Sequence, residues 1–142
     1  MEKVSLSNLT WLRMMRFIHL SNQLSNEHLK EFGLTVAQFD TLMQIKVYQP
    51  LTQGELAERT TVTQGGISRM LSRLEKEGYI RRETEWKTKT ISLTAEGEEI
   101  LSQAQPSQEA FQESFFTEAL TSEELQTFSR MMSKIHRKAI NR

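Results

Sequence analysis

The side chains with the clearest chemical potential lie between residues 63 and 76, where cations and small residues recur at helical spacing. At about 100° per residue, one face of a helix over this stretch carries Gly65, Ser68, Arg69, Ser72, Arg73 and Lys76. The guanidinium fork of arginine matches the O6 and N7 atoms of guanine, or a phosphate, and small residues let a helix backbone approach the floor of a groove. The alternative is an ordinary solvated face, because Glu75 and Glu77 dilute its positive charge.

The other face of the same stretch is apolar. Residues at positions i, i+3, i+4 and i+7, the spacing of an amphipathic helix, are Ile67, Met70, Leu71 and Leu74. Thr63 precedes them as an N-cap, since its hydroxyl can accept from free backbone N–H groups in the first turn. Gly78 follows where a glycine commonly ends a helix. We therefore expect a helix that buries one face and exposes the cationic one.

A shorter helix precedes this one and a hairpin follows it. Thr52 and Glu55 form a Thr-x-x-Glu capping box, and a turn of about four residues, 60–63, separates the two helices. The β-prone runs 79–83 and 89–93 are joined by a charged tip at 85–87. This order predicts a winged helix-turn-helix, in which the second helix fits the major groove of DNA and the hairpin fits an adjacent minor groove.

Three segments resemble the MarR family of winged-helix regulators. They are Leu-Thr-x-x-x-Leu-Ala at 51–57, Arg-x-Leu-x-x-Leu-Glu-x-x-Gly-Tyr-Ile-x-Arg at 69–82, and Leu-Thr-x-x-Gly at 93–97. The layout, with two helices before the helix-turn-helix and two after the wing, extends the resemblance to nearly the whole chain. The resemblance implies a sequence-specific regulator, more commonly a repressor, that binds a palindromic operator as a homodimer. In many relatives a phenolic or lipophilic compound is sensed in a pocket between the dimer helices and the DNA-binding part.

The wing departs from the family pattern. Where relatives carry an Asp-Arg-Arg-like tip, this chain has Glu85-Trp86-Lys87 and a wing about three residues shorter. Lys87 or Lys89 would then supply the cation, and Trp86 would either brace the tip or lie along the sugar edge. Whether the wing enters the minor groove stays open. The expected DNA-binding residues are Thr63, Gln64, Gly65, Ser68, Arg69, Ser72, Arg73, Lys76, Trp86, Lys87 and Lys89.

Charge is balanced overall but unevenly distributed. The 142 residues include 18 Lys or Arg and 18 Asp or Glu. From 63 to 89 there are 7 cationic residues and 4 Glu, whereas 94 to 128 holds 8 Glu and no cation, and 129 to 142 holds 5 cations and no acid. A basic DNA-binding segment beside an acidic one would orient the molecule on DNA. Chance clustering is the alternative.

The helices at both ends are expected to form a dimerisation frame. Residues 5–31 predict a helix that is apolar on more than one face, which requires more than one packing partner. Pro106 should kink or interrupt the helix after the wing, and Thr121 to Glu124 form a capping box for the last helix.

We expect one domain over 1–142, with a winged-helix part at 35–97 and a dimerisation part at 1–31 and 98–142. A self-contained helical core is the alternative. The fold class is mainly α with a small β-hairpin wing, an α+β winged helix-turn-helix.

An effector pocket and the residues that would line it are left open. The candidates are Trp11, Met14, Met15, Phe17 and Phe39, for which a place in the core is the favoured alternative. The composition gives little support to catalysis or to a cofactor. Asp40 is the only aspartate, and His19, His28 and His136 lack metal-ligand spacing. The expected partners are double-stranded DNA, a second copy of the chain and a possible small-molecule effector.

Two further expectations concern where the protein is located and which alternative function it could have. Cysteine is missing, which excludes disulfides. No signal peptide or long apolar run is visible, so a cytoplasmic protein without a membrane segment is expected. The alternative function is a winged-helix protein-interaction module without DNA binding.

Overall fold

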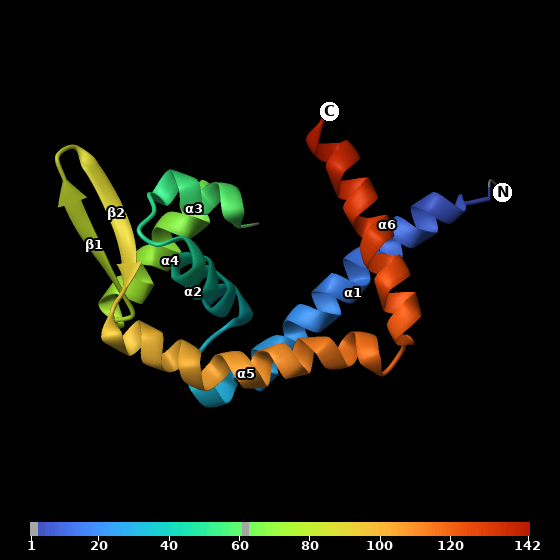
Figure 1. Ribbon diagram of the computed structural model, residues 1–142, viewed down its shortest axis with the longest axis horizontal. Coiled ribbons are helices and arrows are strands. Elements are labelled where there is room, and N and C mark those ends of the chain that lie inside the picture. The colour runs from blue at the N-terminus through green and yellow to red at the C-terminus, as the bar shows by residue number, and fades with distance from the viewer. Residues whose placement is uncertain (1–2, 61–62) are drawn as a thin grey trace. The chain divides into compact units, whose positions relative to one another are not determined.

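The computed structural model describes residues 3–60 and 63–142 and is mainly helical, with one two-stranded hairpin among those residues (Figure 1). The elements are α1 (Leu6–Leu29), the 3-10 helix η1 (Lys30–Phe32), α2 (Val36–Tyr48), α3 (Gln53–Arg59), α4 (Gln64–Lys76), β1 (Ile80–Glu85), β2 (Thr88–Leu93), α5 (Ala95–Thr117) and α6 (Ser122–Ile140). The predicted fold class is confirmed. The chain divides into two compact units, Met1–Gln108 and Glu109–Arg142.

Side-chain caps set where the helices begin. The Thr52 hydroxyl accepts from the Glu55 backbone N–H at 3.1 Å, while the Glu55 carboxylate accepts from the Thr52 N–H at 3.3 Å. Thr121 and Glu124 make the same reciprocal pair at the start of α6. Each pair satisfies two backbone donors that a helix N-terminus leaves open, so both predicted capping boxes are confirmed.

The core of the first unit takes one buried face from each of several elements. Its largest buried apolar side chains come from α1 to α5 and the hairpin: Leu29, Phe39, Leu42, Ile45, Leu51, Leu56, Ile67, Leu71, Leu74, Ile91 and Leu101. In α4, Ile67, Leu71 and Leu74 are fully buried and Met70 packs against the core from its edge. Each fully buried Leu or Ile contributes roughly 1.5–3 kcal/mol. The core therefore determines which face of α4 stays outside.

The hairpin is rooted in the core and free at its tip. β1 pairs antiparallel with β2, with Ile80 opposite Leu93 and Glu85 opposite Thr88, so both strands reach closer to the turn than the runs 79–83 and 89–93 predict. Leu51 adds a bridge to Ile91 through backbone bonds of 3.3 and 2.8 Å. Figure 1 shows the turn of the hairpin standing clear of the helices.

Four residues, which we call the wing root, join the end of α4 to the hairpin and to α5: Gly78, Tyr79, Thr94 and Gly97. The Thr94 hydroxyl donates to the Gly78 carbonyl and accepts from the Gly97 N–H at 3.1 Å, and the Thr94 N–H donates to the Tyr79 carbonyl at 3.1 Å. Gly78 has φ +86°, a left-handed conformation that favours glycine. A Cβ on Gly97 would lie 2.1 Å from the Tyr79 carbonyl oxygen. Only glycine lets α5 pass this carbonyl.

The structure corrects one of the two effects expected of Pro106, an interruption of the helix after the wing; a kink at this position stays a prediction. α5 runs without interruption from Ala95 to Thr117, with Pro106 inside it. Proline removes one backbone donor, and its ring crowds the carbonyl four residues earlier. Leu101 and Ala104 before the proline are buried in the core of the first unit, and this apolar packing offsets the lost hydrogen bond. Gln108 after the proline is also buried, but its amide atoms have no hydrogen-bond partner among the described residues, so its burial does not stabilise the helix.

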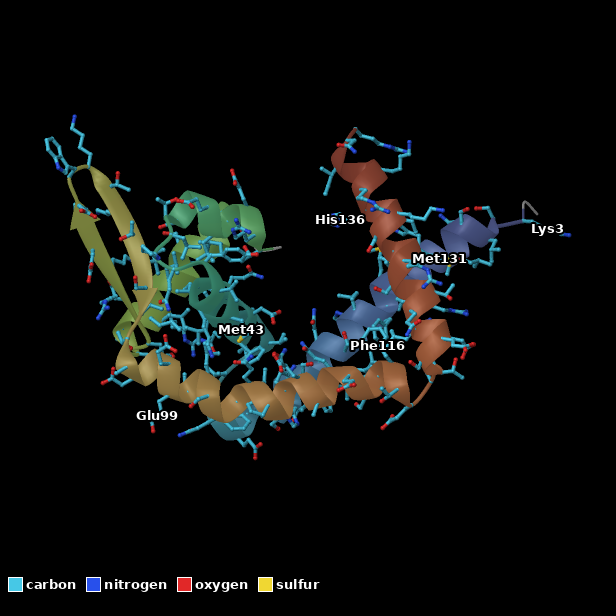
Figure 2. The ribbon with its side chains drawn as sticks, in the orientation of Figure 1. Lys3, Met43, Glu99, Phe116, Met131 and His136 are labelled. Atoms are coloured by element: carbon cyan, nitrogen blue, oxygen red, sulfur yellow. The ribbon has the colours of Figure 1, made fainter. Side chains whose placement is uncertain are left out.

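The second unit, from Glu109 to the end of α6, has little interior. All of its residues are described and none is buried. Phe116, which Figure 2 places near the turn between α5 and α6, lies 6.5 Å from the Phe128 ring, measured between centroids. Phe111 and Phe115 meet edge to face at 5.2 Å. Isolated helices gain most of their stability from tertiary packing, so this unit requires another packing surface.

Gly97→Ala should lower the free energy of unfolding by roughly 2–3 kcal/mol, because the new methyl group would overlap the Tyr79 carbonyl unless α5 shifts. Gly54→Ala is the matched control. Its Cβ would lie 3.9 Å from the Thr52 hydroxyl, an ordinary contact, so we expect a neutral or slightly stabilising change. Urea unfolding measures both variants. Equal stability of Gly97→Ala and wild type would contradict the close approach at the wing root.

Candidate nucleic-acid interface

The exposed face of α4 is presented by a helix that is held at its start and along its buried side. The Thr63 hydroxyl accepts from the Gly66 N–H at 3.1 Å, so the predicted N-cap is present. The helix ends at Lys76 and is capped by Glu77, whose N–H donates to the Arg73 carbonyl, and Gly78 follows. Because the apolar side is fixed in the core, the opposite side cannot rotate away from solvent.

The structure brings the α4 residues predicted for DNA contact onto one exposed surface. Thr63 stands at its start, and the remaining exposed members are Gly65, Ser68, Arg69, Ser72, Arg73 and Lys76. We call this surface the α4 face. The side chain of Gln64 and residues 61–62 of the preceding turn lie outside the described part of the chain. Small residues and cations share the α4 face, as the spacing predicts.

Arg73 is held in place by a weak ion pair. Its Nε donates to the Glu77 carboxylate at 3.0 Å, and the two side chains are 69% and 34% exposed. Exposed pairs of this kind contribute roughly 0–1 kcal/mol. Arg73 can therefore exchange Glu77 for a base edge or a phosphate at small cost.

Gly65 is not required by the packing of the chain itself. A Cβ at this position would meet the Arg69 Nη1 atom at 3.6 Å, an ordinary van der Waals distance. The α4 backbone at Gly65 is consequently uncovered by a side chain of its own. A position without a side chain leaves room for a surface to approach the helix backbone closely there.

The wing carries an aromatic residue and a cation in its turn, and a second cation at the start of β2. Trp86 is 94% exposed and has φ +60°, and Lys87 and Lys89 are also exposed. The three wing residues predicted for DNA contact are therefore exposed, and their contact with DNA stays a prediction. Bracing of the tip by Trp86, one of the two interpretations offered, does not fit so exposed a ring.

Arg82 joins the wing to α4 and was missed by sequence reasoning. Its Nη2 donates to the Ser72 hydroxyl at 3.5 Å, and its Nε lies 3.8 Å from the Glu75 carboxylate. Within the described residues the buried Nε has no hydrogen-bond partner. The only available signal was the arginine that ends the segment at 69–82. Arg82 ties β1 to the side of α4 and helps to fix the wing beside the α4 face.

The candidate effector residues do not form one site in the chain. Trp11, Met14 and Met15 are exposed on α1 and line a hollow of about 460 Å³ with Ile18. Phe17 lines a neighbouring hollow on the same helix. Phe39 is instead buried in the core of the first unit. A place in the core, the favoured alternative for all five, holds for Phe39 alone.

A more polar hollow of about 380 Å³ lies between α1, α2 and the end of α3. Its polar lining is Asn22, Asp40, Thr41, Gln44, Arg59 and Thr60. The protein around Asp40 desolvates its carboxyl group and raises its pKa, although the side chain still reaches solvent. The guanidinium of Arg59 stacks over the Tyr48 ring, with its carbon 3.6 Å from the ring centroid. The sequence offered no signal for this grouping beyond the lone aspartate.

Two negative findings apply to the described residues. Within 3–60 and 63–142, no three His, Cys, Asp or Glu side chains are grouped as a metal site would need. Over the same residues, every helix is too short or too polar to span a bilayer.

Comparisons with known proteins agree with this geometry. A model of the MarR family matches residues 32–85. An "uncharacterized HTH-type transcriptional regulator" of Bacillus cereus is 61% identical over 137 residues, which cover 96% of this chain and 93% of that protein. The multiple antibiotic resistance protein MarR of Escherichia coli is 33% identical over 129 residues, or 84% of this chain and 88% of that protein. A crystal structure of mutant MarR from E. coli complexed with operator DNA is similar with a TM-score of 0.78 and 27% identity, over 93% of this chain and 99% of that one.

Proposed function

The chain belongs to the MarR family of transcriptional regulators, and we propose that it is a repressor that binds a palindromic operator as a homodimer. The observation that carries the proposal is the α4 face, where Arg69 and Arg73 stand beside small, exposed residues. This is a family of regulators rather than enzymes. We assign DNA binding to residues 35–97 and dimerisation to residues 1–31 and 98–142.

The α4 face fits the major groove by both shape and charge. A groove about 12 Å wide admits one helix, and the first turn of α4 carries no bulky side chain at Gly65. The arginines further along offer bidentate donors to guanine or phosphate. Lys76 at the end of the helix extends the positive surface toward the DNA backbone.

Arg73→Ala should weaken specific operator binding by about 1–3 kcal/mol, the range for a lost base contact. Glu77→Gln is the matched control, because it removes the carboxylate that competes for Arg73 and should leave affinity unchanged or improved. The measurement is fluorescence anisotropy with the duplex that wild type selects from a random pool. If Arg69→Ala and Arg73→Ala both bind that duplex like wild type while folded, α4 is not the recognition helix.

Selection of duplexes from the random pool also tests whether the protein binds a palindromic operator as a dimer. A palindromic sequence with two half-sites one helical turn apart is the expected product for a two-fold dimer. Binding should weaken steeply with salt, because cations on the protein replace counterions on the phosphates. A pool that yields no enriched sequence, together with salt-independent binding, would favour the winged-helix interaction module instead.

Unpartnered apolar surface at both ends of the chain supports the dimer. α1 exposes a long series of large apolar side chains, and those at least half exposed are Leu6, Trp11, Met15, Ile18 and Leu20. α6 exposes Met131, Ile135 and Ile140 to a similar degree, and none of its residues is buried. Large apolar side chains exposed in such number indicate surface that an interaction covers. A second copy of the chain offers surfaces of the same chemistry in a two-fold arrangement.

Wild type should be a dimer at micromolar concentration, with a Tm that rises with protein concentration. Ile135→Glu should shift the protein to monomer or aggregate, because it buries an unpaired carboxylate in the interface. Ser133→Glu, on the opposite side of α6, is the control and should stay dimeric. Light scattering measures the mass. A monomeric wild type with a concentration-independent Tm would rule out the homodimer and with it the palindrome.

We also propose release from DNA by a small apolar or phenolic compound. The hollow beside Trp11, Met14 and Met15 is lined by an aromatic ring and thioethers, which adapt well to a flat apolar ligand. Its position on α1 would couple an occupant to the dimer surface. An occupant that binds the DNA-free form more tightly lowers operator affinity by mass action.

Titration with 2,4-dichlorophenol tests this proposal. In Trp86→Phe, which leaves Trp11 as the one tryptophan, saturable quenching of fluorescence is expected. In wild type, operator affinity should fall at least about tenfold at saturation, within the usual range of allosteric coupling. Unchanged Trp11 fluorescence and unchanged operator affinity up to the solubility limit would exclude a phenolic effector in this hollow.

A further inference from the structure

The residue at the wing turn is one that folding alone does not explain. Trp86 occupies the first position of the two-residue turn between Glu85 and Thr88, with φ +60°. Two-residue hairpin turns favour glycine, asparagine or aspartate where φ is positive. Tryptophan is bulky, so this conformation is strained. The ring is also 94% exposed and receives little compensating burial from the described chain.

The surroundings of Trp86 indicate what could cover the ring. Lys87 is its neighbour in the turn and Lys89 lies two residues further on, both exposed. Glu83, the nearest acid on β1 below Glu85, is engaged by Arg81 at 3.3 Å. Glu85 precedes Trp86 and is exposed, so the ring has one acid on its N-terminal side and two ammonium groups on its C-terminal side. A flat apolar ring beside ammonium groups matches a nucleic-acid groove, in which phosphates line the rim and stacked bases form the floor.

The base of the wing holds this tip beside the α4 face. Arg82 reaches Ser72 of the α4 face, and Thr94 binds the Gly78 carbonyl at the end of α4. When α4 lies in a major groove, a hairpin fixed to its side meets the adjacent minor groove. Apolar side chains inserted there partly unstack a base step and kink the duplex, most easily at pyrimidine–purine steps.

We propose that Trp86 is a specificity-determining wedge that inserts between bases of the minor groove and selects deformable TA or CA steps beside each half-site. The inference rests on the proposed operator binding and adds the wing's own sequence preference to it. The lysines bind phosphates on either side and carry no sequence information. The strained turn keeps the ring projecting from the tip.

The test distinguishes the role of the Trp86 ring from that of the lysine charges, because loss of the ring should change sequence preference and loss of a charge should not. The probes are the duplex that wild type selects from a random pool and a series in which each flanking step is changed singly to AA. Trp86→Gly should raise Tm, because glycine relieves the positive φ, yet lower affinity for the selected duplex about tenfold. It should also abolish the preference for TA or CA over AA. Trp86→Phe, which keeps a smaller ring, should retain part of that preference.

Lys87→Ala is the comparison variant. It should weaken binding to every duplex in the series about equally and make the slope of log K against log salt shallower by about 1, since roughly one counterion is released per phosphate contact. In Trp11→Phe, where Trp86 is the one tryptophan, binding of the selected duplex should quench the fluorescence and shield it from acrylamide. The affinity measurements on Trp86→Gly are made in a protein that keeps Trp11. They can therefore be compared directly with wild type.

Three results would overturn the inference. Trp86→Gly could bind the whole series with wild-type affinity and preference, which leaves operator binding intact but removes the wedge. Trp86 fluorescence could stay open to acrylamide on DNA, yet become shielded by vesicles of anionic lipid or by added protein alone, which assigns the ring to another surface. A wild type that selects no duplex would remove the proposed operator binding and this inference together.

Discussion

The contact between Gly97 and the Tyr79 carbonyl is the constraint on which the arrangement of the DNA-binding part depends. A Cβ at Gly97 would approach that oxygen to 2.1 Å, so α5 can begin where it does only because residue 97 has no side chain. Thr94 completes the wing root by bonding to both sides of the contact. The end of α4 thereby meets the end of β2 and the start of α5, which follow it in sequence after the hairpin. A shift of any one would break hydrogen bonds of the other two.

This junction has a functional consequence, because its hydrogen bonds fix the base of the wing beside the end of α4. Contacts that are already made in the free protein reduce the ordering that DNA binding requires, and with it the entropic cost of binding. The charges support the same orientation. Cations lie on α4 and the wing, whereas the first turns of α5 carry Glu96 and Glu98, and Glu99 points outward in Figure 2. DNA phosphates are attracted to the surface of α4 and the wing and are repelled from the start of α5.

Features encoded by local chemistry could be predicted, and features that depend on distant packing could not. The capping boxes at Thr52 and Thr121, and Gly78 after α4, each act within one turn of helix, so their residue types suffice. The uninterrupted course of α5 through Pro106 depends on the burial of Leu101 and Ala104 against other elements, which no local rule contains. Arg82 beside Ser72, and Gly97 beside Tyr79, are contacts between separate elements.

The sequence also predicted that α1 is apolar on more than one face. It could not predict which apolar residues enter the core, as Phe39 does, and which stay exposed, as Trp11 does.

The central claim is that the α4 backbone at Gly65 lies against DNA, and Gly65→Ala tests it most directly. In the free protein the new methyl group meets only the Arg69 guanidinium at 3.6 Å, so Tm should be unchanged or higher. In the complex the same group would stand between the helix backbone and the groove. Affinity for the selected operator should therefore fall by roughly 1–3 kcal/mol, while the protein remains at least as stable. An operator affinity equal to that of wild type, in a protein of unchanged stability, would contradict the account.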